Sequence, residues 1–138
     1  IAPLKIVAEG KHQQLIITGK DNILFRHDVE WTAEALTNII KNAIEHTKPN
    51  GKIEILTDET PLSVQVFIKD NGEGVKKEEL PKVFKRFYKG ENSTNTSNIG
   101  IGLSLSKSII ESQCGSIYVT SEPGIGTQFN ITFLKTVI

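Results

Sequence analysis

Two asparagines, Asn38 and Asn42, stand four residues apart in a segment with helical periodicity. Residues at this spacing lie side by side on one face of a helix. Asparagine is a mediocre helix former, so each one in the middle of a helix costs roughly a few tenths of a kcal/mol. The pair is either two solvated polar positions or two carbonyl oxygens offered to a hard cation such as Mg²⁺, which completes its shell with water and phosphate.

The segment Asp70-Asn71-Gly72-Glu73-Gly74 directly follows a predicted strand. Its two glycines permit positive φ or the close approach of a flat ligand. Asp70, at the strand end, can accept a hydrogen bond in a pocket, and a base with an exocyclic amine is a suitable donor. The alternative is a plain turn, because Asp-Asn-Gly has turn chemistry in any context.

Gly100 and Gly102 precede a second helical segment. Glycines before a helix N-terminus place unpaired N–H groups and the positive end of the helix dipole at one point, which suits a phosphate. Neither the dinucleotide fingerprint nor the P-loop pattern is present. A basic run lies upstream and is either a solvated face or a set of cations for a triphosphate; its members are Lys76, Lys77, Lys82, Lys85, Arg86 and Lys89.

Other catalytic chemistry has little support in the sequence. His12, His27 and His46 share no metal-ligand spacing, and no Ser-His-Asp or Cys-His order indicates a nucleophile. His46 stands one turn after Asn42 and could face the same ligand. Trp31 is interpreted as a core or interface aromatic rather than a stacking platform.

Composition places the chain among single globular domains. It has 138 residues, of which 38% are hydrophobic and 23% charged, and 16 basic residues balance 16 acidic ones. Zero net charge argues against a nucleic-acid partner. Cys114 is the only cysteine, which excludes an intramolecular disulfide, and it is expected to be a small buried residue. The absence of a signal peptide and of a long apolar run suggests a cytosolic protein. The chain has no methionine and opens with Ile1-Ala2-Pro3, so we expect it to be a fragment of a longer protein.

The elements that position these residues follow from periodicity. A hairpin is expected from Leu15–Ile17 and Ile23–Phe25 around residues 19–22. A helix, started by Thr32 or Asp28 and stopped by residues 49–51, carries an apolar stripe of Leu36, Ile39, Ile40, Ala43 and Ile44.

The rest of the chain alternates strands and helices. Further expected elements are a strand pair at 52–57 and 62–69, a short helix at 78–88, a polar loop at 90–98, a helix at about 102–113 and closing strands at 116–121 and 127–134. Strands that pair in hairpins beside separate amphipathic helices indicate an α+β two-layer sandwich. Its helices cover one face of a mixed, mostly antiparallel sheet.

In their order along the chain, these motifs resemble the ATP-binding catalytic domain of bacterial sensor histidine kinases, which has the Bergerat fold. The resemblance runs from about Asp28 to Phe133 and rests on Asn38-x-x-x-Asn42, D-x-G-x-G, V-F-K-R-F-Y, G-x-G-L and Gly126-Thr127-x-Phe129. The phenylalanine-containing motif matters most, since gyrase, heat-shock chaperones and anti-sigma-factor kinases generally lack it.

The resemblance implies a role for each matched residue. Asn42 would ligate Mg²⁺, Asn38 would lie close to the phosphates, and Asp70 would receive the adenine amino group. Thr127 would support the adenine site, and residues 89–99 resemble a flexible lid over ATP. The catalytic set implied is Asn38, Asn42 and Arg86. The ATP-binding set implied is Asn38, Asn42, Glu45, His46, Asp70, Gly72, Gly74, Val75, Phe84, Tyr88, Lys89, Gly100, Ile101, Gly102, Leu103 and Thr127.

The function implied is ATP-Mg²⁺ binding and donation of the γ-phosphoryl group to a histidine on the dimerisation domain of the same kinase. A response regulator would then take the phosphate. Residues 1–138 would form a single cytoplasmic catalytic domain of a membrane-bound homodimer. Two alternatives remain: a serine-directed kinase of the anti-sigma type, and a nucleotide-gated interaction module in which Glu45 and Asn98, departures from the family pattern, mark lost catalysis.

Overall fold

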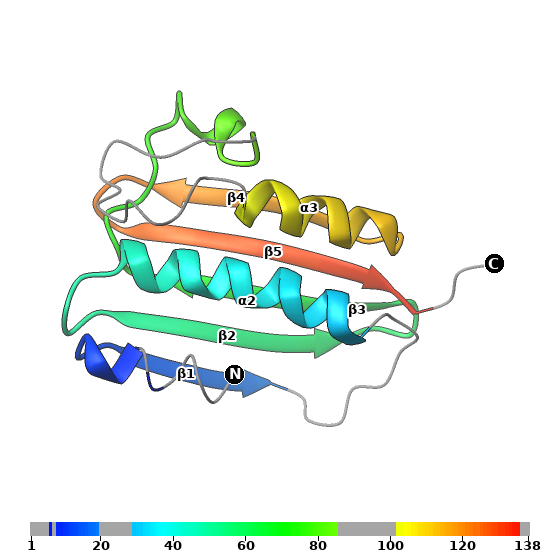
Figure 1. The fold of residues 1–138 in the computed structure, drawn as a ribbon, viewed down its shortest axis with the longest axis horizontal. Coiled ribbons are helices and arrows are strands. Elements are labelled where there is room, and N and C mark those ends of the chain that lie inside the picture. Colours follow the sequence, from blue (N-terminus) through cyan, green and yellow to red (C-terminus); the bar gives the residue numbers. More distant parts are fainter. Residues whose placement is uncertain (1–5, 7, 20–28, 86–101, 136–138) are drawn as a thin grey trace.

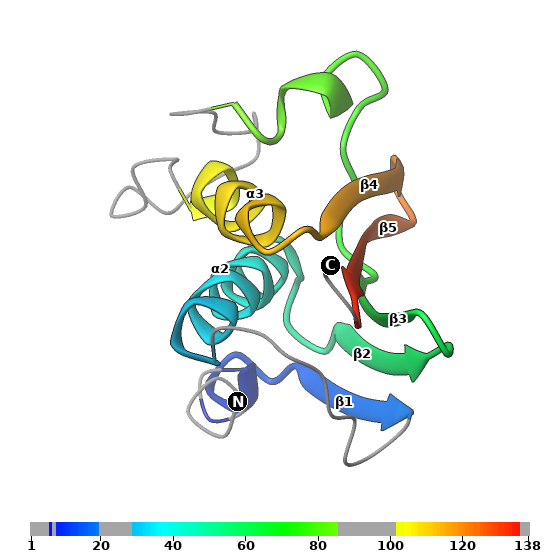
Figure 2. The ribbon, with the colours of Figure 1, turned by 90° about the vertical axis from the view of Figure 1, so that its right-hand side faces the viewer.

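The computed structural model describes residues 6, 8–19, 29–85 and 102–135. Their strands form one sheet in the order β1-β2-β3-β5-β4. In Figure 2, α2 and α3 lie together on one face of this sheet. The strands are β1 (Gln14–Gly19), β2 (Lys52–Glu59), β3 (Ser63–Asp70), β4 (Ser116–Glu122) and β5 (Gly126–Leu134), and the helices are α2 (Val29–His46), α3 (Gly102–Ser112) and the 3₁₀ turn η1 (Leu80–Lys82).

Strand pairing confirms the expected α+β two-layer architecture. β1 runs parallel to β2, whereas the β2–β3, β3–β5 and β4–β5 pairs are antiparallel. Figure 1 shows α2 and α3 lying along the sheet in opposite directions. The sheet of the described residues is therefore mixed and mostly antiparallel.

Alternation along the strands explains which face the helices cover. Val64, Val66 and Ile68 of β3 are buried, and Phe129, Ile131 and Phe133 of the neighbouring strand β5 lie beside them on the same face; the pairs Val64–Phe133, Val66–Ile131 and Ile68–Phe129 are in register. The apolar stripe of α2 packs onto this surface, as its spacing predicts. Each fully buried aliphatic side chain contributes roughly 1.5–3 kcal/mol.

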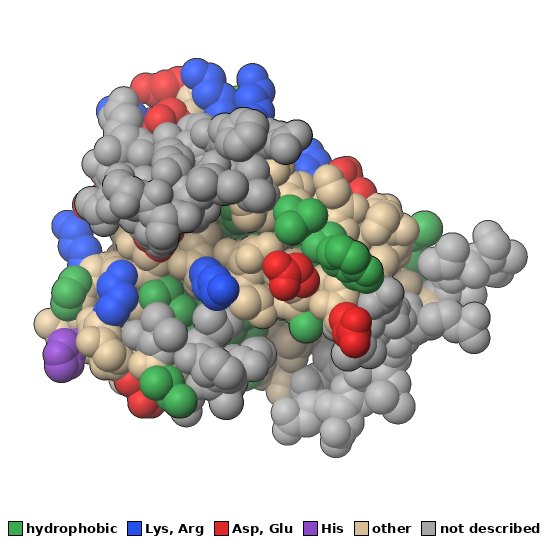
Figure 3. All heavy atoms as spheres, viewed as in Figure 1, with side chains coloured by type: hydrophobic (Ala, Val, Ile, Leu, Met, Phe, Trp, Pro, Cys, Tyr) green, Lys and Arg blue, Asp and Glu red, His purple; other side chains and the backbone are tan. Residues whose placement is uncertain are grey.

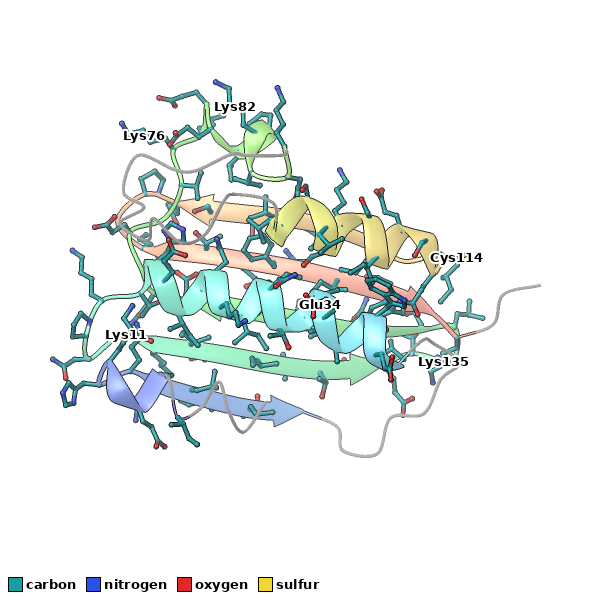
Figure 4. The ribbon with its side chains drawn as sticks, viewed as in Figure 1. Lys11, Glu34, Lys76, Lys82, Cys114 and Lys135 are labelled. Atoms are coloured by element: carbon teal, nitrogen blue, oxygen red, sulfur yellow. The ribbon has the colours of Figure 1, made fainter. Side chains whose placement is uncertain are left out.

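The last turn of α2 is held by the segment before β1. Lys11 Nζ donates to the Ile44 carbonyl at 2.9 Å, and Gln13 Nε2 donates to the carbonyls of Ile44 and Thr47 at 3.0 and 2.5 Å. Figure 4 shows Lys11 beside this end of α2. The final carbonyls of a helix have no partner within it, so these side chains supply the missing donors. Gln13 is 4% exposed, and its Oε1 has no hydrogen-bond partner in the described part of the chain.

Several expectations about individual elements were wrong. Of the two residues expected to start the first helix, Thr32 is wrong, because α2 already begins at Val29, the residue after Asp28; the Thr32 side chain hydrogen-bonds Gln113 instead. The short helix expected at 78–88 is only the three-residue η1 within the described residues. Pro81, inside it, lacks the N–H that a continuing α-helix needs. Leu62 lies outside β3 and is 75% exposed.

Cys114 was expected to be buried and Trp31 to lie in the core or at an interface, and both side chains are exposed. Cys114 follows the end of α3 with a φ of 61° and is exposed, because the chain turns there before β4 rather than continuing the buried stripe. Trp31, on the first turn of α2, is 55% exposed, so of its two expected roles the core one is wrong and the interface one stays a prediction. The second half of the hairpin expected at 23–25, Asp28 and the polar loop at 90–98 lie outside the described residues.

Candidate nucleotide-binding site

The candidate site lies towards one end of the sheet. Figure 1 shows the end of α2, the β4–β5 connection and the chain leaving β3 at this end of the molecule, whereas α3 begins further along the sheet, beside the middle of α2. Across the helix-covered face, Asp70 of β3 pairs with Thr127 of β5, and Thr127 pairs with Ser121 of β4. The pairing brings the aspartate and the final glycine-threonine motif together, as the resemblance implies.

Asp70 continues the buried stripe of β3, so its carboxylate stands where the next apolar side chain would be. It is 4% exposed. The backbone N–H of Gly72 donates to its Oδ1 at 2.9 Å. Burial raises the pKa of Asp70 above its ordinary value, and this is partly opposed by hydrogen bonds from the N–H groups of Gly72 and Thr127 and by the charge of His46. A buried carboxylate with acceptor capacity remaining suits a ligand that brings a hydrogen-bond donor.

The two glycines after Asp70 allow backbone to approach backbone. A Cβ on Gly72 would stand 2.2 Å from the His46 carbonyl oxygen, and one on Gly74 would stand 2.4 Å from the Glu122 carbonyl oxygen. Gly74 also has a φ of 77°, which favours glycine. The glycines therefore seat the loop after β3 against the end of α2 on one side and β4 on the other. Asn71 strengthens this seat, since its Oδ1 accepts the Lys52 N–H at 2.8 Å.

The asparagine helix and the second glycine motif also meet. A Cβ on Gly102 would lie 3.8 Å from both Cβ and Cγ of Asn38. The Ser106 hydroxyl donates to the Ala35 carbonyl at 2.8 Å and fixes α3 against α2. The N-terminal turn of α3, with its unpaired N–H groups, therefore begins beside Asn38. This arrangement suits an anion next to the asparagine pair.

A divalent cation is compatible with the asparagine pair. Both side chains are partly exposed, and neither amide has a hydrogen-bond partner among the described residues. No cluster of three or more His, Cys, Asp or Glu side chains suited to a metal occurs in the described ranges. A cation here would take an amide oxygen of Asn42 and obtain its other ligands from phosphate and water, as Mg²⁺ commonly does.

Phe84 and Leu103, two of the expected ATP-binding residues, pack against the core. The ring of Phe84 meets that of Phe129 edge to face, with centroids 6.0 Å apart, and Lys107 Nζ lies 5.2 Å from the centre of the Phe84 ring. Phe84 therefore anchors the segment after η1 between β5 and α3.

The remaining expected residues are distributed as follows. Glu45 and His46 are partly exposed on the last turn of α2, and Val75 ends the glycine loop. The lysines Lys76, Lys77, Lys82 and Lys85 are exposed around η1, where Figure 3 shows basic and acidic side chains mixed. The residues that lie outside the described ranges are Arg86, Tyr88, Lys89, Gly100 and Ile101.

Sequence reasoning missed Ser121. Its Oγ accepts the Val75 N–H at 2.7 Å, donates to the Gly126 carbonyl at 2.9 Å and lies 2.9 Å from Thr127 Oγ1. One hydroxyl thus joins the glycine loop, the end of β4 and the start of β5. The available signal was the tight connection at 123–125, which places Ser121 opposite Thr127 in a hairpin.

The fold and this site define a class of nucleotide-binding domain, and comparison with known proteins agrees. The chain belongs to the histidine kinase-, DNA gyrase B- and HSP90-like ATPase family, whose model matches residues 27–137. It is therefore an ATPase-type domain of the kind found in sensor histidine kinases.

Named relatives narrow the comparison. The chain is 31% identical over 120 residues to the sensor histidine kinase YvrG of Bacillus subtilis (strain 168), covering 86% of this chain and 21% of the relative. It is 40% identical over 114 residues to the sensor protein SrrB of Staphylococcus aureus (strain NCTC 8325 / PS 47), covering 81% and 20%. The chain thus spans about a fifth of the length of these curated relatives.

Solved structures share the fold. The nucleotide-free catalytic domain of histidine kinase ThkA aligns with a TM-score of 0.81 at 25% identity, covering 99% of this chain and 92% of that one. The mycobacterial sensor histidine kinase MprB aligns with a TM-score of 0.86 at 20% identity, covering 99% and 91%, and shows likeness of fold. Among the helices of the described residues, none has the length and apolar character needed to cross a membrane.

Proposed function

We propose that this domain binds ATP with Mg²⁺ and donates the γ-phosphoryl group to a histidine on the dimerisation domain of its parent sensor kinase. The observation that carries the proposal is the buried Asp70 carboxylate, held at the junction of α2, β3 and β5 in a chain of the histidine kinase-like ATPase family. In this proposal Asp70 accepts a hydrogen bond from the adenine amino group, with Thr127 beside it. Asn38 and the first turn of α3 face the phosphates.

The chemistry asked of this chain is positioning and charge neutralisation. In the transfer, a nitrogen of the acceptor histidine forms a bond to the γ-phosphorus while the bond from that phosphorus to the bridging oxygen breaks, and ADP leaves. Mg²⁺, held by Asn42, would supply charge compensation for the phosphate oxygens. The N–H groups at the start of α3 add hydrogen bonds to the same oxygens. Any base for the acceptor belongs to the partner domain.

The wider setting is part of the same proposal. Residues 1–138 act as one catalytic domain on the cytoplasmic side of a membrane-bound homodimer. Its partners are the histidine-containing dimerisation domain and, through that domain, a response regulator. The names of the relatives, both sensor proteins, support this setting.

Transfer to a separately supplied dimerisation domain tests the proposal. With labelled ATP and Mg²⁺, the chain should transfer label to that domain as acid-labile, base-stable phosphohistidine, and should not label itself. The transfer will be slow, because a tether that normally supplies an effective concentration of about millimolar is missing. Asn42→Ala should remove it, whereas Lys41→Ala, an exposed neighbour on α2, should not. Intact ATP binding without a labelled histidine would refute the kinase assignment and favour a nucleotide-gated module.

A further inference from the structure

The hydroxyl of Ser121 has more hydrogen-bond partners than protons. Its three neighbours are the Val75 N–H, the Gly126 carbonyl oxygen and the Thr127 hydroxyl, at 2.7, 2.9 and 2.9 Å. Val75 donates, because an amide N–H has only a proton to offer. Gly126 accepts, because a carbonyl oxygen has none. The single hydroxyl proton of Ser121 can therefore be donated either to the Gly126 carbonyl oxygen or to the Thr127 hydroxyl oxygen.

Directing the Ser121 proton to Gly126 satisfies all three contacts. Thr127 then donates its own hydroxyl proton to Ser121. In the reverse arrangement Ser121 donates to Thr127, and the oxygens of Ser121 and Gly126 face each other at 2.9 Å with no proton between them. Each oxygen would then lose a hydrogen bond without gaining another, which is unfavourable at a half-buried position. The first arrangement is the one that the geometry favours.

This direction of the hydrogen bond, from Thr127 to Ser121, determines which hydrogen bonds Thr127 can make to a ligand. With its proton committed to Ser121, the Thr127 oxygen has only lone pairs left. Thr127 is the register partner of Asp70, and directly opposed residues in an antiparallel pair have Cβ atoms about 4.5–5.5 Å apart. Two acceptors, a carboxylate and a hydroxyl oxygen, therefore stand side by side on the helix-covered face. Thr127 is itself 8% exposed, so little water competes for its oxygen.

We propose that Ser121 is a positioning residue that holds the Thr127 hydroxyl as an acceptor, and that it thereby makes the site select purines with a 6-amino group over purines with a 6-oxo group. The inference rests on the proposed ATP site and adds the origin of its base selectivity. An amino group brings two N–H donors to the two acceptors. A 6-oxo group brings a third acceptor, which neither side chain can satisfy.

Removing the Ser121 hydroxyl releases Thr127. In Ser121→Ala the Thr127 proton has no partner on β4, so the hydroxyl can rotate and donate to a 6-oxo group. Affinity for ITP relative to ATP should therefore rise. One neutral hydrogen bond gained in place of an acceptor–acceptor contact raises the ratio of ITP affinity to ATP affinity about five- to tenfold. Ser121→Thr keeps a hydroxyl at the same position and should keep the selectivity of the parent chain.

Calorimetric titration of the chain with ATP and with ITP, each with Mg²⁺, tests the inference. We expect the parent chain and Ser121→Thr to prefer ATP, and Ser121→Ala to lose at least about fivefold of that preference. The decisive control repeats Ser121→Ala in a Thr127→Val background. There the ATP-to-ITP ratio should not respond to Ser121, because its effect passes through the Thr127 hydroxyl. A purely structural role would not show this dependence.

The outcomes distinguish a failure of this inference from a failure of the proposed ATP site. Equal losses of ATP and ITP affinity in Ser121→Ala, with the ratio unchanged, would overturn the inference and leave the ATP site intact. A ratio change that persists in the Thr127→Val background would also overturn it. Nearly equal affinities of the parent chain for ATP and ITP would also overturn the inference. This comparison needs no variant, so it remains available if a variant fails to fold. Binding of neither nucleotide by a folded parent chain would overturn the proposed ATP site itself.

Discussion

Asp70→Asn should remove useful nucleotide binding and leave the fold nearly unchanged. The substitution keeps the shape of the side chain but replaces one carboxylate oxygen with an NH₂ group. The N–H groups of Gly72 and Thr127 both point at this side chain. The amide oxygen can still accept from these N–H groups, but the NH₂ group then faces the adenine amine, which is a contact between two donors.

The expected loss follows from those contacts. A hydrogen bond from an amine to a carboxylate contributes about 1.5–3 kcal/mol, and a loss of about 2 kcal/mol weakens the Kd roughly 30-fold. Stability should change by less than about 1 kcal/mol, because relief from burying a charge offsets the lost hydrogen bond. Asp70 is buried, so little of this is screened by solvent.

Titration calorimetry with ATP and urea unfolding measure the two effects separately. Binding of tripolyphosphate should be nearly the same in Asp70→Asn as in the parent chain, since the proposed site places the phosphates beside Asn38 and α3 rather than beside Asp70. Asp58→Asn is a matched control, because Asp58 is exposed and pairs with Gln65 towards the other end of β3. An ATP affinity of Asp70→Asn within about twofold of that of the parent chain would contradict the proposal that Asp70 binds the adenine amino group.

Three further predictions concern pH, backbone packing and the end of α2. Because the pKa of Asp70 is raised, the folded chain takes up this proton at a higher pH than the unfolded chain does. As the pH falls through that pKa, the affinity for ATP should fall while the free energy of unfolding rises. Calorimetry and urea titrations at several pH values measure both changes, and the part that depends on Asp70 should be absent in Asp70→Asn. Gly72→Ala should destabilise the fold by about 1–3 kcal/mol, because its Cβ would stand 2.2 Å from the His46 carbonyl oxygen, whereas Gly10→Ala, with nothing within 4 Å of its Cβ, should cost nothing in the same urea measurement. Gln13→Leu should lower the free energy of unfolding by about 1–2 kcal/mol, since two carbonyls at the end of α2 lose their donor; an unchanged urea midpoint would contradict that capping role.

Local patterns predicted the elements well where one face is covered. The alternation through Val64, Val66 and Ile68 and the helical spacing of Ile39, Ile40 and Ala43 depend on burial, and the structure buries all six side chains. The parallel pairing of β1 with β2 could not be predicted in this way, because the two strands are joined through α2 and their pairing is not local.

The sequence predicted the motifs of the candidate site but not the contacts between the segments that carry them. Asp70 and Gly72 stand in a contiguous motif, so their order along the chain pointed to a pocket. Gly102 reaches Asn38 only after α3 packs on α2, and that packing depends on contacts such as Ser106 to Ala35. Ser121 belongs to no motif, and its role follows from the register of β4 on β5. Exposure of Cys114 was missed because residue type alone does not tell where a helix ends.

The parallel edge strand has a consequence for the order in which the domain opens. The β2–β3 and β4–β5 hairpins close over a few residues, whereas β1 closes over the whole of α2, with Leu15 opposite Ile53. Contacts between distant segments are expensive in loop entropy, so β1 is expected to join the sheet late in folding and to leave it first. When β1 detaches, Lys11 and Gln13 leave with it, and the last turn of α2 frays beside His46. We therefore expect the fraying of β1 and of the last turn of α2 to be one local unfolding event, which amide exchange would show as one shared rate for the two regions.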